Sequence, residues 1–104
     1  MQREVLKGHA DLLVLAALAA GPAHGYAVVE AVRVRSAGAF DLAEGTVYPA
    51  LYRLERQGLL VSAWSDAGAR RRRVYKLTRR GQSELAQQRS EWGGYVTAMG
   101  AALA

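Results

Sequence analysis

The stretch EGTVYPALYRLERQ, residues 44–57, decides the fold, because it combines an apolar stripe with an unusual opposite side. Val47, Leu51 and Leu54 recur at the spacing of a single helix face, so the stretch predicts a helix with a buried stripe. Pro49 lacks a backbone donor, and a helix start near Thr46 places it where that loss costs little.

The opposite side of this helix carries polar and aromatic residues instead of the charges typical of a solvated face. Rotation by about 100° per residue places the following residues there or on its flanks: Gly45, Thr46, Tyr48, Pro49, Tyr52, Arg53 and Arg56. Threonine, tyrosine and arginine side chains are suited to base edges, sugars and phosphates. An alternative stays open, in which Tyr48 packs against the preceding helix and Tyr52 covers the rim.

Two further helices are expected before this stretch. Asp11 precedes a leucine-rich segment that predicts a central or interface helix ending at Gly21-Pro22. A second helix is predicted over about residues 23–35, where the apolar side comprises Tyr26, Val29 and Val32. A break follows at Ser36, Gly38 and Asp41.

The positive charge is concentrated after the 44–57 helix. The net charge is +5, and half of the 14 Lys and Arg residues lie between positions 70 and 80. Residues 59–64 and 74–77 are each predicted to form a strand, with a turn over 65–69. The expected hairpin carries Arg70, Arg71, Arg72 and Arg73 at its tip and return edge, where guanidinium groups can bind phosphate oxygens.

Helices joined by a glycine-containing turn and followed by a basic hairpin indicate a mainly α protein with a winged helix-turn-helix. The hairpin is its wing, with two β-strands. We expect residues 1–78 to form this DNA-binding domain. The 104-residue length leaves no room for a second globular unit, and 51% hydrophobic with 22% charged residues is typical of a folded chain.

Residues 79–104 are predicted to form a C-terminal dimerisation helix. Thr78 is a good N-cap, and Leu85, Trp92 and Met99 follow at heptad spacing. A lone winged helix offers little surface to bury such a seam, so a second copy is its simplest partner. Two copies would present two recognition helices about 34 Å apart.

Other classes of function are disfavoured. The chain has no Cys and only two His residues, so we expect no metal, and no cofactor motif is present. His24 is interpreted as a helix-start side chain that packs or contacts a phosphate. No pair or triad of catalytic residues stands out, so we expect no enzyme. With no membrane span and no leader peptide evident, we expect a cytoplasmic protein.

Three motifs also resemble the PadR family of bacterial transcriptional regulators. They are His-Gly-Tyr at 24–26, Gly-Thr-Val-Tyr-Pro at 45–49 and Arg-Arg-Val-Tyr-Lys-Leu-Thr at 72–78. The resemblance covers roughly residues 5–81. Family members usually have Gly-Gly before the wing arginines, whereas this chain has Gly68-Ala69.

The resemblance implies a homodimeric repressor that binds a palindromic operator and releases it when a small molecule binds. The recognition helix would contain Thr46, Tyr48, Tyr52 and Arg53. Short members of the family, with a single C-terminal helix as here, carry a tryptophan near the position of Trp92, where two copies enclose flat apolar or aromatic ligands. Trp92 is therefore a candidate ligand-binding residue, although a simple interface anchor is the other interpretation.

The sequence thus predicts a sequence-specific regulator of double-stranded DNA. Arg56 and the four wing arginines complete the candidate contacts. Two alternatives stay open: a non-specific architectural DNA-binding protein, and a ligand-binding or protein-interaction dimer with weak or non-specific DNA binding.

Overall fold

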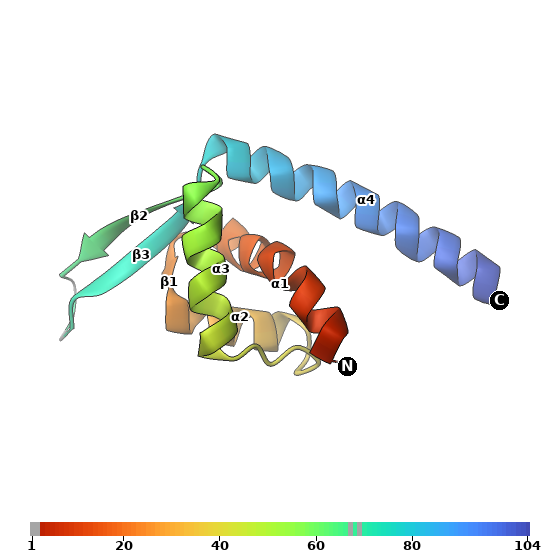
Figure 1. Ribbon diagram of the computed structural model, residues 1–104, viewed down its shortest axis with the longest axis horizontal. Helices are drawn as coiled ribbons and strands as arrows, with labels where there is room; N and C mark the ends of the chain where they lie inside the picture. The colour runs from red at the N-terminus through yellow and green to blue at the C-terminus, as the bar shows by residue number, and fades with distance from the viewer. Residues whose placement is uncertain (1–2, 67, 69) are drawn as a thin grey trace.

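The computed structural model describes residues 3–66, 68 and 70–104, with side chains described from His9 onward (Figure 1). Four α-helices, one short 3-10 helix and three strands follow one another in the described part of the chain. In chain order they are α1 (Arg3–Ala17), η1 (Leu18–Ala20), β1 (Ala23–His24), α2 (Gly25–Arg35), α3 (Glu44–Arg56), β2 (Leu60–Ser65), β3 (Arg72–Leu77) and α4 (Arg79–Leu103).

The core lies where α1, α2 and α3 meet. Val47, Leu51 and Leu54 of α3 are buried, which confirms the predicted stripe. They pack in one cluster with Val14 and Leu15 of α1 and with residues of α2. Burial of such side chains stabilises a small domain by about 1.5–3 kcal/mol each relative to exposure. The core therefore fixes which side of α3 faces outward.

The helix boundaries differ from the predicted ones for identifiable reasons. The predicted helix of about residues 44–57 is confirmed, since α3 begins at Glu44 and the carbonyl of Ala43 accepts hydrogen bonds from the N–H groups of Thr46 and Val47. The later start near Thr46, which would have placed Pro49 in the first turn, does not occur. Pro49 therefore lies inside the helix, where its missing N–H leaves the carbonyl of Gly45 without its helical partner. Gly45 is exposed, so water can satisfy that carbonyl.

The sheet has three strands instead of the expected two. The wing strands β2 and β3 pair antiparallel, and β1 adds on the other side of β3 in the order β1-β3-β2. Ala23 pairs with Tyr75 and His24 with Val74, so α2 begins at Gly25 and not at residue 23. A two-residue strand has no periodicity of its own, and only its partner strand about 50 positions later defines it.

Two other details of the helices correct the sequence-based prediction. The helix α1 extends further toward the N-terminus than the leucine-rich segment after Asp11. On α2 the buried side comprises Val28, Val29 and Val32, whereas Tyr26 is exposed. The predicted break after α2 is confirmed, since Ala37 and Gly38 both adopt positive φ there.

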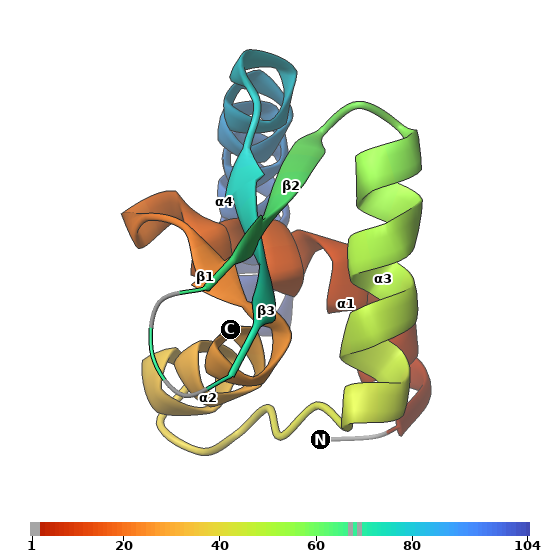
Figure 2. The ribbon, with the colours of Figure 1, turned by 90° about the vertical axis from the view of Figure 1, so that its left-hand side faces the viewer.

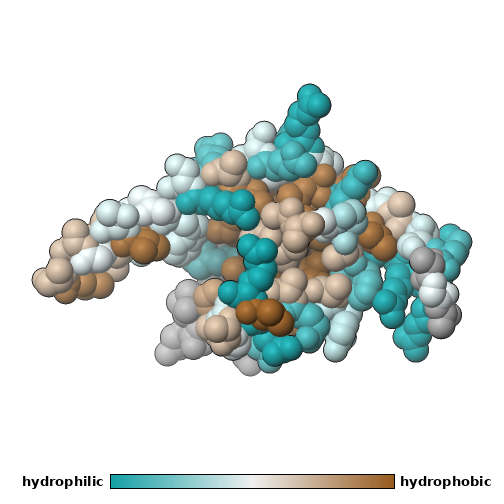
Figure 3. All heavy atoms as spheres, turned by 180° about the vertical axis from the view of Figure 1, so that it is seen from behind, coloured by the Kyte–Doolittle hydropathy of each residue, from teal (hydrophilic) through white to brown (hydrophobic). Residues whose placement is uncertain are grey.

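The helix α4 starts as predicted and then leaves the body. The Thr78 side chain accepts a hydrogen bond from the Gly81 N–H at 3.0 Å and caps the helix. Leu85 is buried, but beyond Trp92 the helix projects past the core, opposite the wing (Figure 1). The molecule measures 52 × 27 × 20 Å. Hydrophobic surface gathers at the free end of α4 and hydrophilic surface at the wing end (Figure 3).

Candidate nucleic-acid interface

The outward face of α3 carries the side chains that the sequence singled out. Tyr48, Tyr52, Arg53 and Arg56 are exposed, with 46% of Tyr48 and 61% of Tyr52 accessible, while Thr46 is half-buried. The guanidinium carbon of Arg56 lies 5.7 Å from the centre of the Tyr52 ring. The face is therefore aromatic and cationic, and it lies beside the wing at the same end of the molecule (Figure 2).

Tyr48 has a second role, which the open alternative anticipated. A Cβ atom placed on Gly25 would lie within 3.0 Å of the ring carbons and hydroxyl of Tyr48. The tyrosine ring thus rests directly on the backbone at the start of α2, and about half of it remains accessible. Tyr48 is therefore both packed and partly exposed, whereas Tyr52 is more exposed and has the guanidinium of Arg56 over its ring.

Arg53 is held by an acidic residue of α1. Its Nη2 donates to Asp11 Oδ1 at 2.7 Å, and both side chains are about half exposed. The hydrogen bond and the charge of Asp11 raise the pKa of the Arg53 guanidinium above its ordinary value, so it stays charged. Sequence reasoning did not find Asp11 as a site residue, because the pair spans 42 positions.

The wing arginines divide between two surroundings. The guanidinium carbons of Arg71 and Arg73 lie 4.9 and 5.3 Å from the Trp64 ring centre. Arg72 points away from Trp64 and toward His24, with its Nη1 2.9 Å from His24 Nε2. Arg70 is exposed, and no ion pair to it occurs within residues 3–66, 68 and 70–104. The predicted turn is described only in part, since Ala67 and Ala69 lie outside the described residues.

His24 is the N-cap of α2, which confirms its predicted place at a helix start. Its Nδ1 accepts from the Ala27 N–H at 3.3 Å, while Nε2 faces Arg72. A neutral imidazole has one acceptor nitrogen, so the cap and the Arg72 contact compete for it. Because the contact with Arg72 joins positions 48 apart, no local signal in the sequence could have shown it.

One tyrosine of the wing, Tyr75, is part of the hydrophobic core. Tyr75 of β3 is buried, and burial raises the pKa of its hydroxyl above the ordinary value, with a further contribution from the Glu55 carboxylate. Glu55 itself accepts a hydrogen bond from Ser62 Oγ at 2.7 Å. Glu55 thus links α3 to β2 by a hydrogen bond and lies close enough to Tyr75 of β3 to affect its hydroxyl.

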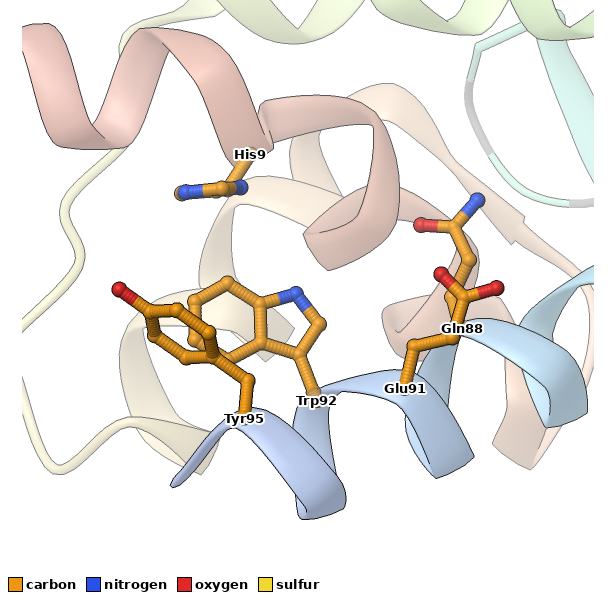
Figure 4. Close-up of a pocket in the computed structure, with 5 residues that line it drawn as sticks. All are labelled: His9, Gln88, Glu91, Trp92 and Tyr95. Atoms are coloured by element: carbon orange, nitrogen blue, oxygen red, sulfur yellow. The ribbon is translucent and has the colours of Figure 1, made fainter. Parts of the chain in front are cut away.

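Trp92 lies in a hollow between α1 and α4, away from the α3 face (Figure 4). The hollow has a volume of about 430 Å³ and is lined by His9, Gln88, Glu91, Trp92 and Tyr95. The rings of His9 and Tyr95 meet the indole edge-on, at centre distances of 4.9 and 5.3 Å. We call this hollow the Trp92 pocket. Sequence reasoning found Trp92 and missed the His9 contact from α1.

Two further chemical features can be assessed within the described residues. In residues 3–66, 68 and 70–104, no group of three or more His, Cys, Asp or Glu side chains could hold a metal ion. Within the same part of the chain, no helix is both long enough and apolar enough to cross a bilayer.

A helical core with a small antiparallel sheet, a projecting hairpin and an exposed helix beside it defines a winged-helix protein. The sequence agrees with one branch of this class, since the model of the Transcriptional regulator PadR-like family matches residues 14–87. The chain belongs to that family. It is accordingly a transcriptional regulator and not an enzyme.

Solved structures of related proteins agree over nearly the whole chain. A PadR family transcription regulator from Clostridium difficile is 32% identical, with 93% of this chain and 100% of that chain covered and a TM-score of 0.82. One from Eggerthella lenta is 33% identical, with 96% and 86% covered and a TM-score of 0.81. Bacillus subtilis PadR, solved with operator DNA, shares the fold at 21% identity, with 76% and 45% covered and a TM-score of 0.68.

Proposed function

We propose that the protein is a sequence-specific regulator that binds double-stranded DNA through α3 and the wing. The observation that carries this proposal is the exposed tyrosine and arginine face of α3 beside a hairpin with four consecutive arginines. An α-helix fits the major groove, and arginines on a hairpin can bind the flanking phosphates. The operator complex of the Bacillus subtilis relative supports the same use of the fold.

The two elements would divide the work of recognition. Tyr52, Arg53 and Arg56 stand on the helix that enters the groove, so they are the candidates to read bases, together with Thr46 and Tyr48. The wing arginines, Arg70–Arg73, would contact phosphates and fix the position of the protein on the duplex. Specificity then comes from α3, and affinity common to all sequences comes from the wing.

Selection of bound sequences from randomised duplex DNA tests the proposal. We expect two half-sites in inverted orientation, about one helical turn apart. Affinity for the selected site should fall steeply with salt, with a slope of log affinity against log salt of about −5 if the two wings neutralise about six phosphates. Recovery of random sequences, or a slope near zero, would contradict the proposal.

The inverted half-sites require a homodimer, and the free end of α4 supports one. Tyr95, Val96, Met99 and Leu103 are exposed and share one side of α4 as an apolar stripe, on the part of the helix that projects beyond its own core (Figure 1). An apolar helix face of this kind is stabilised when a partner covers it. A second copy provides the same stripe and satisfies the two-fold symmetry of a palindromic operator.

The dimer is tested by charge substitutions on α4. Val96→Lys puts a charge into the stripe and should shift the protein from dimer to monomer in sedimentation equilibrium. Thr97→Lys adds the same charge on an exposed neighbour that points about 100° away around the helix, and should leave the dimer intact. A monomeric wild type, or equal effects of the two substitutions, would count against this seam.

Release by a small apolar or aromatic effector completes the proposed mechanism, with the protein acting as a cytoplasmic repressor. The Trp92 pocket supports it, because an accessible hollow lined by aromatic rings suits a flat ligand. The chain has two tryptophans, so Trp64→Phe leaves Trp92 as the single reporter. Quinoline should quench its fluorescence and loosen the DNA complex, whereas Trp92→Phe should abolish the effect on DNA.

A second candidate is a ligand-binding or protein-interaction dimer with weak or non-specific DNA binding. The ion pair of Arg53 with Asp11 favours it, because it already partly neutralises a candidate DNA-binding side chain. Competition with excess random duplex separates the two candidates. A regulator of specific sites should keep its selected DNA under that competition, and the alternative predicts that it will not.

A further inference from the structure

Trp64 is a large aromatic residue on the wing that contributes little to the core. It lies near the end of β2, with 53% of the residue accessible. Its prominent contacts are the two guanidinium groups of Arg71 and Arg73, at 4.9 and 5.3 Å from the ring centre. Both distances lie within the range of cation–π attraction. The indole thus gathers two of the four wing arginines.

The strand register places Trp64 and Arg73 on the side of the sheet that faces α3, and Arg71 contacts the same indole. Trp64 is paired with Arg73 across the hairpin, so their side chains share one face. Ser62, two residues earlier on β2, shares that face and donates to Glu55 of α3. Arg72 belongs to the opposite face, where it meets His24. Because side chains alternate along β3, Arg73 points to the side of the sheet that faces α3. The guanidinium of Arg71 contacts the same indole ring as Arg73.

The acidic neighbour of Arg71 is a weaker constraint than the indole. Arg71 Nε lies 3.5 Å from Asp66 Oδ1, and the two side chains are 65% and 86% exposed. An ion pair that long and that exposed contributes little in water. Contact with an aromatic ring does not use the N–H donors of a guanidinium. Arg71 Nε faces Asp66, and Arg73 also interacts with the Tyr75 hydroxyl, so the remaining donors of the two arginines are the ones available to a phosphate.

We propose that Trp64 is a positioning residue for DNA binding, which holds Arg71 and Arg73 ready for the backbone on the α3 side. This inference rests on the proposed DNA binding. A free arginine loses considerable rotamer entropy when it binds a phosphate, and an arginine already held on an indole loses less. Trp64 raises affinity for every duplex through the two arginines, and it does not change how many phosphates are neutralised.

Substitutions at Trp64, measured on the selected operator and on a random duplex of equal length, test this role. Trp64→Leu should weaken both complexes about fivefold, in line with the rotamer freedom that two arginines no longer held on the indole would lose on binding, and should leave the salt slope unchanged. Trp64→Phe keeps a ring and should weaken them much less. Val61→Ala is the matched control, because Val61 is an exposed apolar residue of the same strand on the opposite face.

The background of Arg71→Ala with Arg73→Ala distinguishes positioning from direct contact. If Trp64 acts through the arginines, Trp64→Leu should have no further effect there. A further loss of affinity in that background would mean that the indole itself contacts DNA and would overturn the proposal. An unchanged affinity of Trp64→Leu in the otherwise native chain would overturn it as well.

A measurement without DNA separates this inference from the proposed function. In the free protein, NMR relaxation of the Nε–H groups should show that Arg71 and Arg73 become more mobile in Trp64→Leu, while the amide spectrum of the helices stays native. Equal mobility in both proteins would overturn the positioning role even if DNA binds. Ordered arginines in a protein that binds no duplex would instead refute the DNA-binding function and, with it, the use assigned to Trp64.

Discussion

Asp11 on α1 and Arg53 on α3 are joined by a hydrogen-bonded ion pair of 2.7 Å, which crosses between the two helices on the accessible side of the molecule. Both side chains are about half exposed, so the pair is expected to contribute at most about 1 kcal/mol to stability. Its main consequence is the orientation of a long, flexible side chain. An arginine held in one orientation can discriminate between bases more sharply than one that samples many.

We therefore expect Asp11→Asn to lower DNA specificity with little loss of stability. Arg53 would be freed, and a negative charge near the DNA-facing side would be removed. Binding to random duplex should tighten about threefold, as expected for the removal of a repulsion worth under about 1 kcal/mol. The ratio of operator to random affinity should fall. A ratio equal to that of wild type, measured by fluorescence anisotropy at fixed salt, would show that Asp11 does not orient Arg53.

The wing and α3 should respond differently to alanine substitution. Arg71→Ala together with Arg72→Ala should weaken operator and random DNA to the same extent and reduce the salt slope by about one for each arginine. Tyr52→Ala or Arg53→Ala should instead reduce the preference for the operator by about 1–3 kcal/mol for each base that is no longer read. Equal effects on both DNAs for both sets of variants would contradict this division.

Local sequence patterns predicted much of this fold. The spacing of Val47, Leu51 and Leu54 predicted α3 and its outward face, and Thr78 predicted the start of α4, because each signal lies within a few residues of its effect. The wing hairpin was predicted from the turn residues at 65–69 and from the run of arginines at 70–73. The extent of α1 and the burial of Tyr26 were misjudged, since tertiary packing overrides a helix periodicity that is weak or mixed.

The contacts that organise the candidate interface could not be predicted in the same way. Asp11 with Arg53, His24 with Arg72 and the pairing of β1 with β3 join residues that are far apart in the chain. Local patterns in a sequence do not show which distant side chains meet. The exposed tyrosines and arginines of α3 were found from the helix spacing, but their partners depend on how three helices and a hairpin pack.

Gly25 should allow Tyr48 to pack on the start of α2. In Gly25→Ala the new Cβ would meet the far end of the tyrosine side chain, which is half exposed and can move aside, so we expect a loss of only about 1 kcal/mol in the free energy of unfolding. Tyr48→Ala removes the ring, so the double variant should be less destabilised than the sum of the two single ones. Gly45→Ala is the control, because open space surrounds Gly45. Urea denaturation gives all four values, and additivity would argue against the contact.

The buried Tyr75 predicts a specific loss of stability in alkali. Burial, and after it the charge of Glu55, raise the pKa of its hydroxyl above the ordinary value of 10.0, so the folded protein binds this proton more tightly than the unfolded chain. The stability that comes from this more tightly bound proton is fully present below pH 10.0, the pKa of the unfolded chain. It is lost as the pH rises through the higher pKa that Tyr75 has in the folded protein. Tyr75→Phe cannot ionise, so its free energy of unfolding should fall less between neutral and strongly alkaline pH than that of the wild type. Tyr26→Phe is the control, because it removes a hydroxyl from an exposed ring and should lose stability in alkali as the wild type does. Urea titrations at each pH give the free energy of unfolding. If that of Tyr75→Phe falls as steeply as that of the wild type, the prediction is wrong.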